Sequence, residues 1–434
     1  HKTELVEKAI QITGLTNPNS RNQLLTWINN NSDLKLEKLT KETVAESLQI
    51  AEDQVAEVLH IRRALAKSSI SKYESMKNAV CADGRIRGVL QFYGANRTGR
   101  WAGRLVQVQN LPHDVPVAMD TAIRLVKNGN ARGVKLMYGH ISTSLSHLIR
   151  AAFVAPEGSL LCVSDFSAIE ARVLSWLADE KWRQDVFAKG GDIYCASASS
   201  MFGVPVEKHG INGHLRQKGK VAELALGYQG GPPALITMGA LKQGLTEDEL
   251  PDIVHRWRGA NPRICGLWYD VDGAALSVMS DARPVGLPHG ILISRECNLL
   301  YGYDYLTIQL PSGRKLYYPQ PYINENQFGK PALHYRVQAG IKWSHTSTYG
   351  GKLVENITQA IARDCLALAI NRLVKAGYKP LMHIHDEVVL EVPKDKIHED
   401  EIDRINQIMC APIPWAPGLL LNADGFISPY YTKD

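Results

Sequence analysis

The feature that most constrains this chain is a largely apolar hairpin with a His, an Asp and a Glu at its tip. Residues 380–393 form two apolar runs joined at His385-Asp386-Glu387, and their alternation pairs the second run with the first. Asp is common in turns for structural reasons, but this turn has neither Gly nor Asn. Carboxylates this close repel each other unless a cation or basic group lies nearby. The sequence therefore predicts a buried hairpin whose acidic tip meets a cation.

A soft-metal site is an alternative reading of the same hairpin. His383 and His385 could be two zinc ligands on one strand face, but no third soft ligand follows nearby. The seven cysteines are scattered and form no CxxC pair. This pattern favours free thiols in a reducing compartment over a disulfide framework or a zinc site.

A second acidic position follows a short apolar run. Residues 160–164 predict a buried strand, and Asp165 stands where this strand gives way to a helix that ends near Ala178. Open α/β architectures place chemistry at such strand ends. Two structural readings compete with that one. Asp165 can complement the helix dipole, and Ser167 with Glu170 has the spacing of a capping box.

A basic stripe occupies a third segment, where Arg216, Lys220, Leu224 and Tyr228 recur every four residues. On an α-helix each such step rotates by about 40° net and rises about 6 Å, so the four side chains share one stripe. Two cations precede an aromatic ring by a length that suits a nucleoside triphosphate lying along the helix. Arg grips phosphate bidentately and Lys acts as a point charge. The alternative is a surface helix with solvated cations.

Length and charge set broad bounds. The 434 residues are enough for two or three packed subdomains, and a net charge of +5 permits a phosphate-rich partner without requiring one. No stretch approaches the roughly 20 apolar residues that span a bilayer, and no signal peptide opens the chain. The first residue is His1 rather than Met, which suggests trimming.

Periodicity and turn residues predict the organisation of the chain. We expect helix over 1–80, a Gly-rich stretch turning strand-like over 93–112, helix over 186–245, a hairpin over 306–318, and helix over 353–376.

Taken together, the three charged segments resemble the signature motifs of family A DNA polymerases, the DNA polymerase I family, in the right order. The amino-acid sequences of the first two motifs most resemble those of the phage and prophage branch of this family. The matching segments are Asp165-Phe-Ser-Ala-Ile-Glu-Ala-Arg172, Arg216…Lys220…Tyr228 and His385-Asp386-Glu387, with lesser matches at 98–100, 109–112, 148–158 and Gln359.

The resemblance implies an α+β fold shaped as a right hand, with an antiparallel palm sheet, helical fingers and a helical thumb. The implied boundaries are 1–80 for the thumb, 81–185 for the first part of the palm, 186–349 for the fingers and 350–434 for the second part of the palm.

The implied activity is template-directed DNA synthesis, in which dNTPs are added to a primer 3′ end and pyrophosphate is released. Asp165, Asp386 and the backbone carbonyl of Phe166 would hold two Mg²⁺ ions, with Mn²⁺ as a substitute. Arg216 and Lys220 would clamp the triphosphate.

Other roles carry over to single positions. Around the nucleotide, Tyr228 would pack near the nascent base pair, Glu170 would exclude a 2′-hydroxyl, and Leu224 and Tyr194 would complete the pocket. The implied primer and DNA contacts are His385 and Glu387 at the primer end, with Arg100, Asn110 and Gln359 on the DNA.

This chain departs from the bacterial pattern at several positions. Leu224 replaces an aromatic residue, Gln229 a glycine, Tyr194 a histidine and Asp114 an arginine. No acidic constellation typical of a proofreading nuclease occurs in residues 1–80. A single-subunit RNA polymerase and a catalytically inactive primer–template-binding protein remain as alternatives. Glu170 argues against the first, and the intact pair of aspartates argues against the second.

The expected partners are primer–template DNA and dNTPs, with accessory replication proteins possible. We expect no membrane association, a monomer, and an intracellular location in a bacterium or a phage-infected host.

Overall fold

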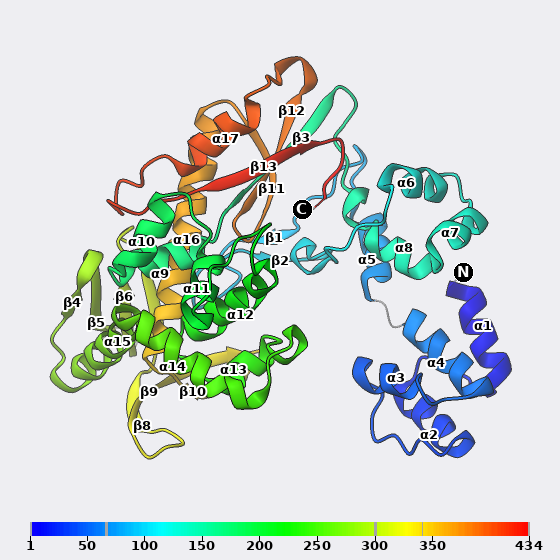
Figure 1. Ribbon diagram of the computed structural model, residues 1–434, viewed down its shortest axis with the longest axis horizontal. Coiled ribbons are helices and arrows are strands. Elements are labelled where there is room, and N and C mark those ends of the chain that lie inside the picture. Colours follow the sequence, from blue (N-terminus) through cyan, green and yellow to red (C-terminus); the bar gives the residue numbers. More distant parts are fainter. Residues whose placement is uncertain (1, 66–67, 299–301, 341, 433–434) are drawn as a thin grey trace. The chain divides into compact units, whose positions relative to one another are not determined.

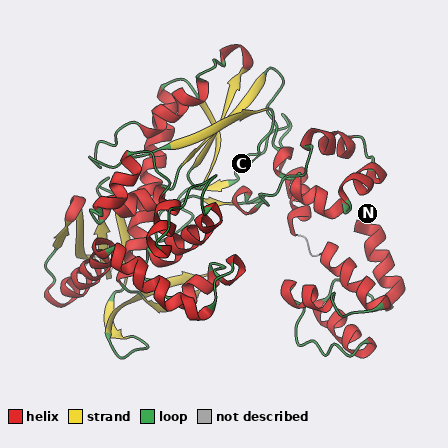
Figure 2. Cartoon of the chain, viewed as in Figure 1, coloured by secondary structure: helices red, strands yellow, loops and turns green. Residues whose placement is uncertain are grey.

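The computed structural model describes residues 2–65, 68–298, 302–340 and 342–432. The chain divides into two compact units. The first unit comprises His1–Val89, Gly103–Val154 and Tyr430–Asp434, and the second comprises Leu90–Ala102 and Ala155–Pro429. Figure 2 shows helices dominating the first unit and the large sheets lying in the second. No helix within the described ranges is long and apolar enough to cross a membrane.

The first unit is built from short helices, as predicted for residues 1–80. Capping side chains start several of them: Ser20 accepts from the Gln23 N–H, Thr40 forms a reciprocal box with Thr43, and Asn130 accepts from the Gly133 N–H. The helices are α1 (Lys2–Thr13), α2 (Arg21–Asn31), α3 (Lys41–Ser47), α4 (Asp53–Leu65), α5 (Ser68–Ala79), α6 (Met119–Lys127), α7 (Ala131–Tyr138) and α8 (Ile141–His147), with 3₁₀ turns η1 (Val108–Asn110) and η2 (Arg150–Ala152).

Two features hold this unit together. Leu24, Ile28 and Leu59 centre an apolar cluster beneath α2, α3 and α4. Arg150, which is only 2% exposed, donates to the carbonyls of Leu111 and Pro112 and to the hydroxyl of Tyr431. Such a buried guanidinium, satisfied by distant segments, ties the chain terminus to the middle of this unit.

The strand-like stretch expected over 93–112 is shorter than predicted. Strand β1 (Leu90–Gln91) pairs with β2 (Ala102–Gly103), and the chain then enters η1. The backbone at Gly94 passes so close to Ala102 that a side chain would not fit, because a Cβ on Gly94 would lie 2.3 Å from the Ala102 Cβ.

A four-stranded antiparallel sheet lies in the second unit, in the order β11–β12–β3–β13 (Figure 1). The strands are β3 (Ser159–Phe166), β11 (Lys379–Ile384), β12 (Glu387–Pro393) and β13 (Ala423–Ser428). Both the buried strand predicted over 160–164 and the hairpin predicted near 381–392 are confirmed. Helices α16 (Gly350–Lys375) and α17 (Glu401–Cys410) pack against this sheet.

Helix α16 runs through the main core of the second unit. Leu353, Ile357 and Ile361 are at most 2% exposed. Its first turn starts with two glycines because other segments approach closely: a Cβ on Gly350 would lie 1.9 Å from the Trp268 carbonyl oxygen, and one on Gly351 2.4 Å from that of Tyr228.

Residues between the two halves of this sheet form helices first and strands afterwards. The helices are α9 (Ile169–Leu177), α10 (Lys181–Ala188), α11 (Ile193–Phe202), α12 (Arg216–Leu226), α13 (Pro232–Thr237), α14 (Leu250–Ala260) and α15 (Pro262–Asp281). The 3₁₀ turns of this unit are η3 (Gly213–Leu215), η4 (Leu241–Gln243), η5 (Glu247–Glu249), η6 (Pro288–Gly290) and η7 (Lys394–Lys396).

Two further antiparallel sheets follow α15. One has the order β4–β5–β6–β7 and the other β10–β9–β8. The strands are β4 (Val285–Leu287), β5 (Ile291–Asn298), β6 (Tyr303–Gln309), β7 (Lys315–Pro319), β8 (Tyr322–Glu325), β9 (Pro331–Ala339) and β10 (Lys342–Ser347). The hairpin predicted over 306–318 is thus confirmed as β6–β7.

Candidate active site

The two acidic segments singled out in the sequence meet at one end of the four-stranded sheet. Asp165 lies near the end of β3, and its register partner on β12 is Glu387. Asp386 occupies the turn immediately before β12, and its carbonyl oxygen accepts a hydrogen bond from the Phe166 N–H at 3.3 Å. Residues more than two hundred positions apart in sequence therefore lie on neighbouring strands, as the resemblance requires.

A further carboxylate, on β13, forms a row across the sheet with Asp165 and Glu387. The register places Asp424 of β13 directly opposite Asp165, and directly opposite residues extend from the same face of an antiparallel pair. Asp424 is exposed and accepts a hydrogen bond from the Ser167 hydroxyl at 2.6 Å. Glu387, in contrast, is only 1% exposed. Asp424 could not be predicted from the sequence, because nothing local distinguishes it from an ordinary strand-end acid.

The turn that carries Asp386 has an unusual backbone. His385 has φ +54°, the left-handed region that glycine prefers, and its side chain is exposed. A two-residue hairpin turn needs positive φ, and a non-glycine residue there costs about 1–3 kcal/mol. The absence of Gly noted in the sequence leaves this turn strained, and the hydrogen bond from the Phe166 N–H holds Asp386 against the end of β3.

The other histidine of the hairpin does not pair with His385 as a zinc ligand. His383 packs edge-on against the Trp101 ring, with centroids 4.5 Å apart, and Arg363 stacks on the same ring at 4.2 Å. Burial, followed by the charge of Arg363, lowers the pKa of His383 to about 4. Among the residues that the structure describes, no group of three His, Cys, Asp or Glu side chains is arranged to hold a metal ion.

Arg100 connects the acidic turn to the first motif. Its Nη2 lies 3.0 Å from Glu170 Oε1 and 3.3 Å from Asp386 Oδ1, and all three side chains are one-fifth to one-quarter exposed. Within the described part of the chain its Nε is buried without a hydrogen-bond partner. The second oxygen of Glu170 accepts from the Tyr228 hydroxyl at 2.9 Å.

This network rules out the capping-box reading of Glu170. The residue before α9 is Ala168, with φ +51° and no side-chain cap, while the Ser167 hydroxyl bonds to Asp424. Burial, and secondly the neighbouring Glu170, raise the pKa of Tyr228 well above its ordinary value. The phenol therefore stays protonated and continues to donate to Glu170.

The cations of α12 gather around one aromatic ring. Arg216 donates from Nε to Asp192 Oδ2 at 2.7 Å, and its guanidinium lies 5.2 Å from the centre of the Tyr194 ring. The Lys220 ammonium lies 6.0 Å from the same ring. This approach depends on Gly219, since a Cβ there would lie 2.1 Å from the Tyr194 carbonyl oxygen.

The predicted stripe is correct for three of its four members. Arg216, Lys220 and Leu224 lie on α12, and Leu224 is 43% exposed. Tyr228, however, lies beyond the helix, which ends at Leu226. The chain turns there because Gln229 adopts φ +68°, a conformation in which glycine is usual. Its amide oxygen accepts from the Gly351 N–H at 3.1 Å and so joins this turn to α16.

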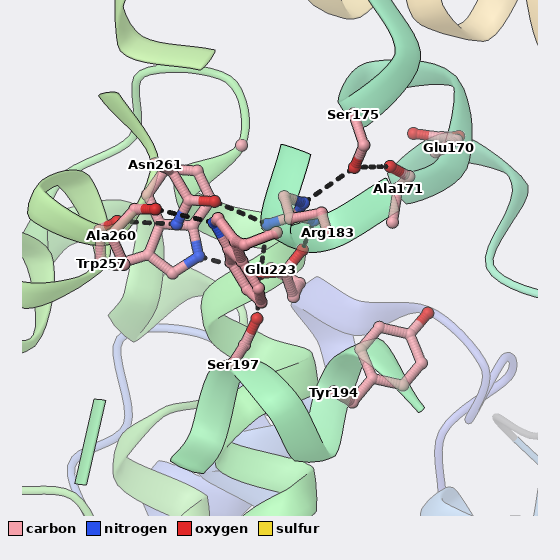
Figure 3. Close-up of polar contacts among 12 residues, drawn as sticks. Glu170, Ala171, Ser175, Arg183, Tyr194, Ser197, Glu223, Trp257, Ala260 and Asn261 are labelled. Atoms are coloured by element: carbon pink, nitrogen blue, oxygen red, sulfur yellow. Dashed lines mark hydrogen bonds and ion pairs between the residues drawn. The ribbon is translucent and has the colours of Figure 1, made fainter. Parts of the chain in front are cut away.

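Behind α12 lies a buried ionic cluster that sequence reasoning also missed. Figure 3 shows Arg183 held between Ser175, Glu223 and Asn261. Glu223 accepts further bonds from the Ser197 hydroxyl at 2.6 Å and the Trp257 indole N–H at 2.9 Å. The cluster locks α12 against α9, α10, α11 and α14, and so fixes the helix that carries the cationic stripe.

The remaining predicted DNA contacts are less closely tied to these carboxylates. Gln359 is half-buried on α16. Its neighbour Ala360 accepts, through its carbonyl, a bond from Arg314 at 3.0 Å. Asn110 is exposed at the end of η1 in the first unit and donates to the Gln107 side chain at 3.3 Å. The DNA contacts assigned to these residues stay predictions.

Comparison of the sequence with known proteins identifies the family of this chain. The model of DNA polymerase family A matches residues 1–247, which is more than half of the chain and includes the first two motifs. The chain belongs to DNA polymerase family A. All 434 residues align with the DNA polymerase of Bacillus phage SP02, which is 51% identical and of which the chain covers 66%.

More distant family A relatives cover less of the chain. DNA polymerase I of Thermus thermophilus is 27% identical over 59% of the chain, and that of Pseudomonas aeruginosa 24% over 60%. The chain spans only about a quarter of the length of each, 25% and 24%.

A solved structure matches the fold. It is the POL domain of Pol1 from M. smegmatis in a complex with DNA primer-template and dNTP, which aligns with a TM-score of 0.64 and 18% identity. The alignment covers 99% of this chain and 64% of the other. This likeness confirms the α+β polymerase fold expected from the sequence.

Proposed function

We propose that this family A chain is a template-directed DNA polymerase that adds dNTPs to a primer 3′ end and releases pyrophosphate. One observation carries the proposal. Asp165 and Asp386, from the first and third motifs, lie side by side at the end of one antiparallel sheet. Arg100 and Glu170 connect Asp386 to Tyr228, which lies just beyond the cationic helix. A carboxylate pair next to a cationic helix is the arrangement that nucleotidyl transfer requires.

The donor set suits magnesium. Asp165 and Asp386 are partly exposed carboxylates, and the Phe166 carbonyl would add a third hard oxygen ligand. Magnesium keeps several waters and binds through one or two carboxylates and substrate phosphates, so a larger protein cluster is not needed. When bound, two such ions would activate the primer hydroxyl and neutralise the triphosphate.

Arg100 would act as a placeholder in this site. Its ion pair with Asp386 compensates the carboxylate and keeps its oxygens oriented, which limits the repulsion among neighbouring acids. The partnerless Nε indicates that the guanidinium is not saturated by protein groups within the described ranges. It could therefore turn toward DNA and still keep its contact with Glu170.

The triphosphate would lie along α12. Lys220 has no ion pair among the described residues and would contribute a full positive charge, whereas Arg216 is shared with Asp192. Tyr194 lies beneath both cations and orients them through its ring face. At the other end Glu170, held by Tyr228, would crowd a 2′-hydroxyl.

Primer extension tests this proposal. The full chain is given a labelled primer–template with dNTPs or rNTPs, with and without Mg²⁺. We expect extension with dNTPs only when Mg²⁺ is present, and none by Asp165→Asn. A clear preference for rNTPs would instead support the single-subunit RNA polymerase reading. Tight primer–template binding without extension would support an inactive binding protein.

A further inference from the structure

The sheet β8–β9–β10 has two chemically different faces. Leu333 and Tyr335 of the central strand β9 are 0% and 6% exposed and belong to the main core. Because successive residues of a strand point to opposite faces, His334 and Arg336 extend from the other side. One face of the sheet thus packs against the main core, and the other face points away from it.

Aromatic and basic side chains gather on this outer face. The register places Tyr322 opposite His334, His345 opposite Arg336, and Trp343 opposite Gln338. The rings of Tyr322 and His334 stack at 5.3 Å, and the Arg336 guanidinium lies 5.6 Å from the Trp343 ring. The aromatic–basic face is defined here as Tyr322, His334, Arg336, Trp343 and His345.

The aromatic–basic face is partly exposed, and among the described residues of this sheet no acid lies on it. Trp343 is 53% exposed, although an indole normally seeks burial. Residues 322–347 include three Lys or Arg and a single acid, Glu325. Glu325 pairs with Pro331 and therefore belongs to the opposite face. The Arg336 Nε and the His334 Nε2 are buried without a hydrogen-bond partner among the described residues, whereas the Arg336 Nη1 donates to the Gln320 side chain at 3.0 Å.

This combination fits a single-stranded nucleic acid. Unpaired bases stack on exposed aromatic rings, and cations beside those rings contact the phosphates. Duplex DNA already stacks its bases internally, so it would gain nothing from an exposed indole. The Arg336–Trp343 pair supplies both contacts within one nucleotide step.

The sheet is also linked, through the start of α16, to the turn that carries Tyr228. The Thr348 N–H, just after β10, donates to the Leu333 carbonyl at 2.8 Å, and α16 begins two residues later. The first turn of α16 is bonded to Gln229, the residue after Tyr228. A single DNA strand bound to the aromatic–basic face would therefore lie on a sheet that is linked, through α16, to the predicted position of the nascent base pair.

We propose that the aromatic–basic face binds single-stranded DNA, namely the template that has not yet been copied. The assignment to a template rests on the proposed function, whereas the binding of single-stranded DNA does not.

The experiment compares overhangs. Fluorescence anisotropy measures the affinity of the full chain for a labelled primer–template with a 2-nucleotide or a 25-nucleotide single-stranded 5′ overhang, at one salt concentration. Trp343→Ala is expected to bind the long overhang about 5- to 100-fold more weakly. Its affinity for the short overhang should stay unchanged, and Trp343→Phe should retain most of the affinity because it keeps a ring.

Matched variants separate this face from general effects. Lys342→Ala removes a cation from the same sheet on the opposite face, so Arg336→Ala should cost more affinity for the long overhang than Lys342→Ala. Tyr303→Ala removes a similarly exposed ring, 49% exposed, from the other sheet and should have no effect. Circular dichroism confirms folding.

Equal affinity of Trp343→Ala and wild type for the long overhang would overturn the proposal. So would an equal loss in Tyr303→Ala. Extension on the short overhang reports on the proposed function separately: a wild-type chain that binds overhangs but extends no primer would refute polymerase activity and still support the face.

Discussion

Two arginine-centred ionic clusters lie in the same unit of this protein and differ in how completely they are satisfied. Arg183 is 0% exposed and donates to Glu223, Ser175 and Asn261. Arg100 is 20% exposed and contacts Glu170 and Asp386 with one nitrogen. Its Nε has no partner among the described residues.

The difference indicates what each cluster is for. A fully desolvated and fully paired arginine cannot exchange its partners without a large penalty, so the Arg183 cluster fixes the position of α12. A partly exposed arginine that shares two acids can release one of them at low cost. The cluster that is able to bind a metal ion or DNA is therefore distinguished by an arginine whose hydrogen-bond donors are not all paired, and not by its number of charges.

The largest expected effect is on catalysis, in Asp386→Asn. The asparagine oxygen can still accept from Arg100, so the fold and primer–template binding should persist. The negative charge that would hold the metal is lost, and the single-turnover extension rate should fall at least about 1,000-fold. Asp395→Asn, in the exposed turn η7, is the matched control and should extend normally. Near wild-type extension by Asp386→Asn would remove the catalytic role from the Arg100 cluster.

The second prediction concerns stability and uses the buried cluster. Arg183→Met would leave Glu223 charged and buried without its main partner, so the free energy of unfolding should fall by about 3–5 kcal/mol. Arg100→Met, which removes a partly exposed arginine, should cost about 1 kcal/mol or less. Urea unfolding followed by circular dichroism measures both. Equal losses in the two variants would break the distinction between the clusters.

The Arg100 cluster could be predicted in part from the sequence and the Arg183 cluster could not, for a physical reason. Asp165 and Asp386 each end a local apolar run, and a strand-end acid is visible within about ten residues. Arg183 and Glu223 are forty positions apart on different helices, where each alone looks like an ordinary charged helix residue. Only the packing of the helices shows that they are buried together.

One alternative reading and one prediction fail for a similar reason. The capping box considered as an alternative for Glu170 satisfied a local pattern, but the side chain instead contacts Arg100 and Tyr228, which are distant in sequence. Tyr228 fitted the four-residue spacing along α12. The helix nevertheless ends at Leu226, because the chain turns where Gln229 adopts a positive φ. Hydrophobic period and order of motifs thus predicted the sheet and its acids. Side-chain partners and the exact helix end depended on contacts distant in sequence.

The third prediction contrasts a paired with an unpaired cation. Lys220 has no ion pair within the described ranges, whereas Arg216 is bonded to Asp192. Lys220→Ala should therefore raise the KM for dNTPs about 10- to 100-fold, the loss expected for one charge-assisted contact. Lys218→Ala, which removes the neighbouring lysine near the Gly244 carbonyl, is the control and should change KM little. An unchanged dNTP dependence in Lys220→Ala would refute the clamp.

The smallest predicted effect tests a buried group that is kept neutral beside a cation. His383 packs on Trp101 near Arg363, and burial lowers its pKa from 6.5 to about 4. Because the unfolded chain binds this proton more readily, the histidine's contribution to stability is complete above pH 6.5 and is lost as the pH falls toward 4. Between pH 7 and pH 5 the cost should be about 1–2 kcal/mol.

His383→Phe keeps a ring against Trp101 and removes the proton-binding site, so the variant should lose less stability than wild type over this pH range. Urea midpoints at pH 7 and pH 5 give the comparison. His398→Phe, a histidine in the exposed stretch before α17, controls for the general effect of acid and should behave as wild type. If wild type and His383→Phe lose equal stability between pH 7 and pH 5, His383 is not held neutral by its surroundings. The distinction drawn between the Arg183 and Arg100 clusters would then not apply to the group of His383, Trp101 and Arg363.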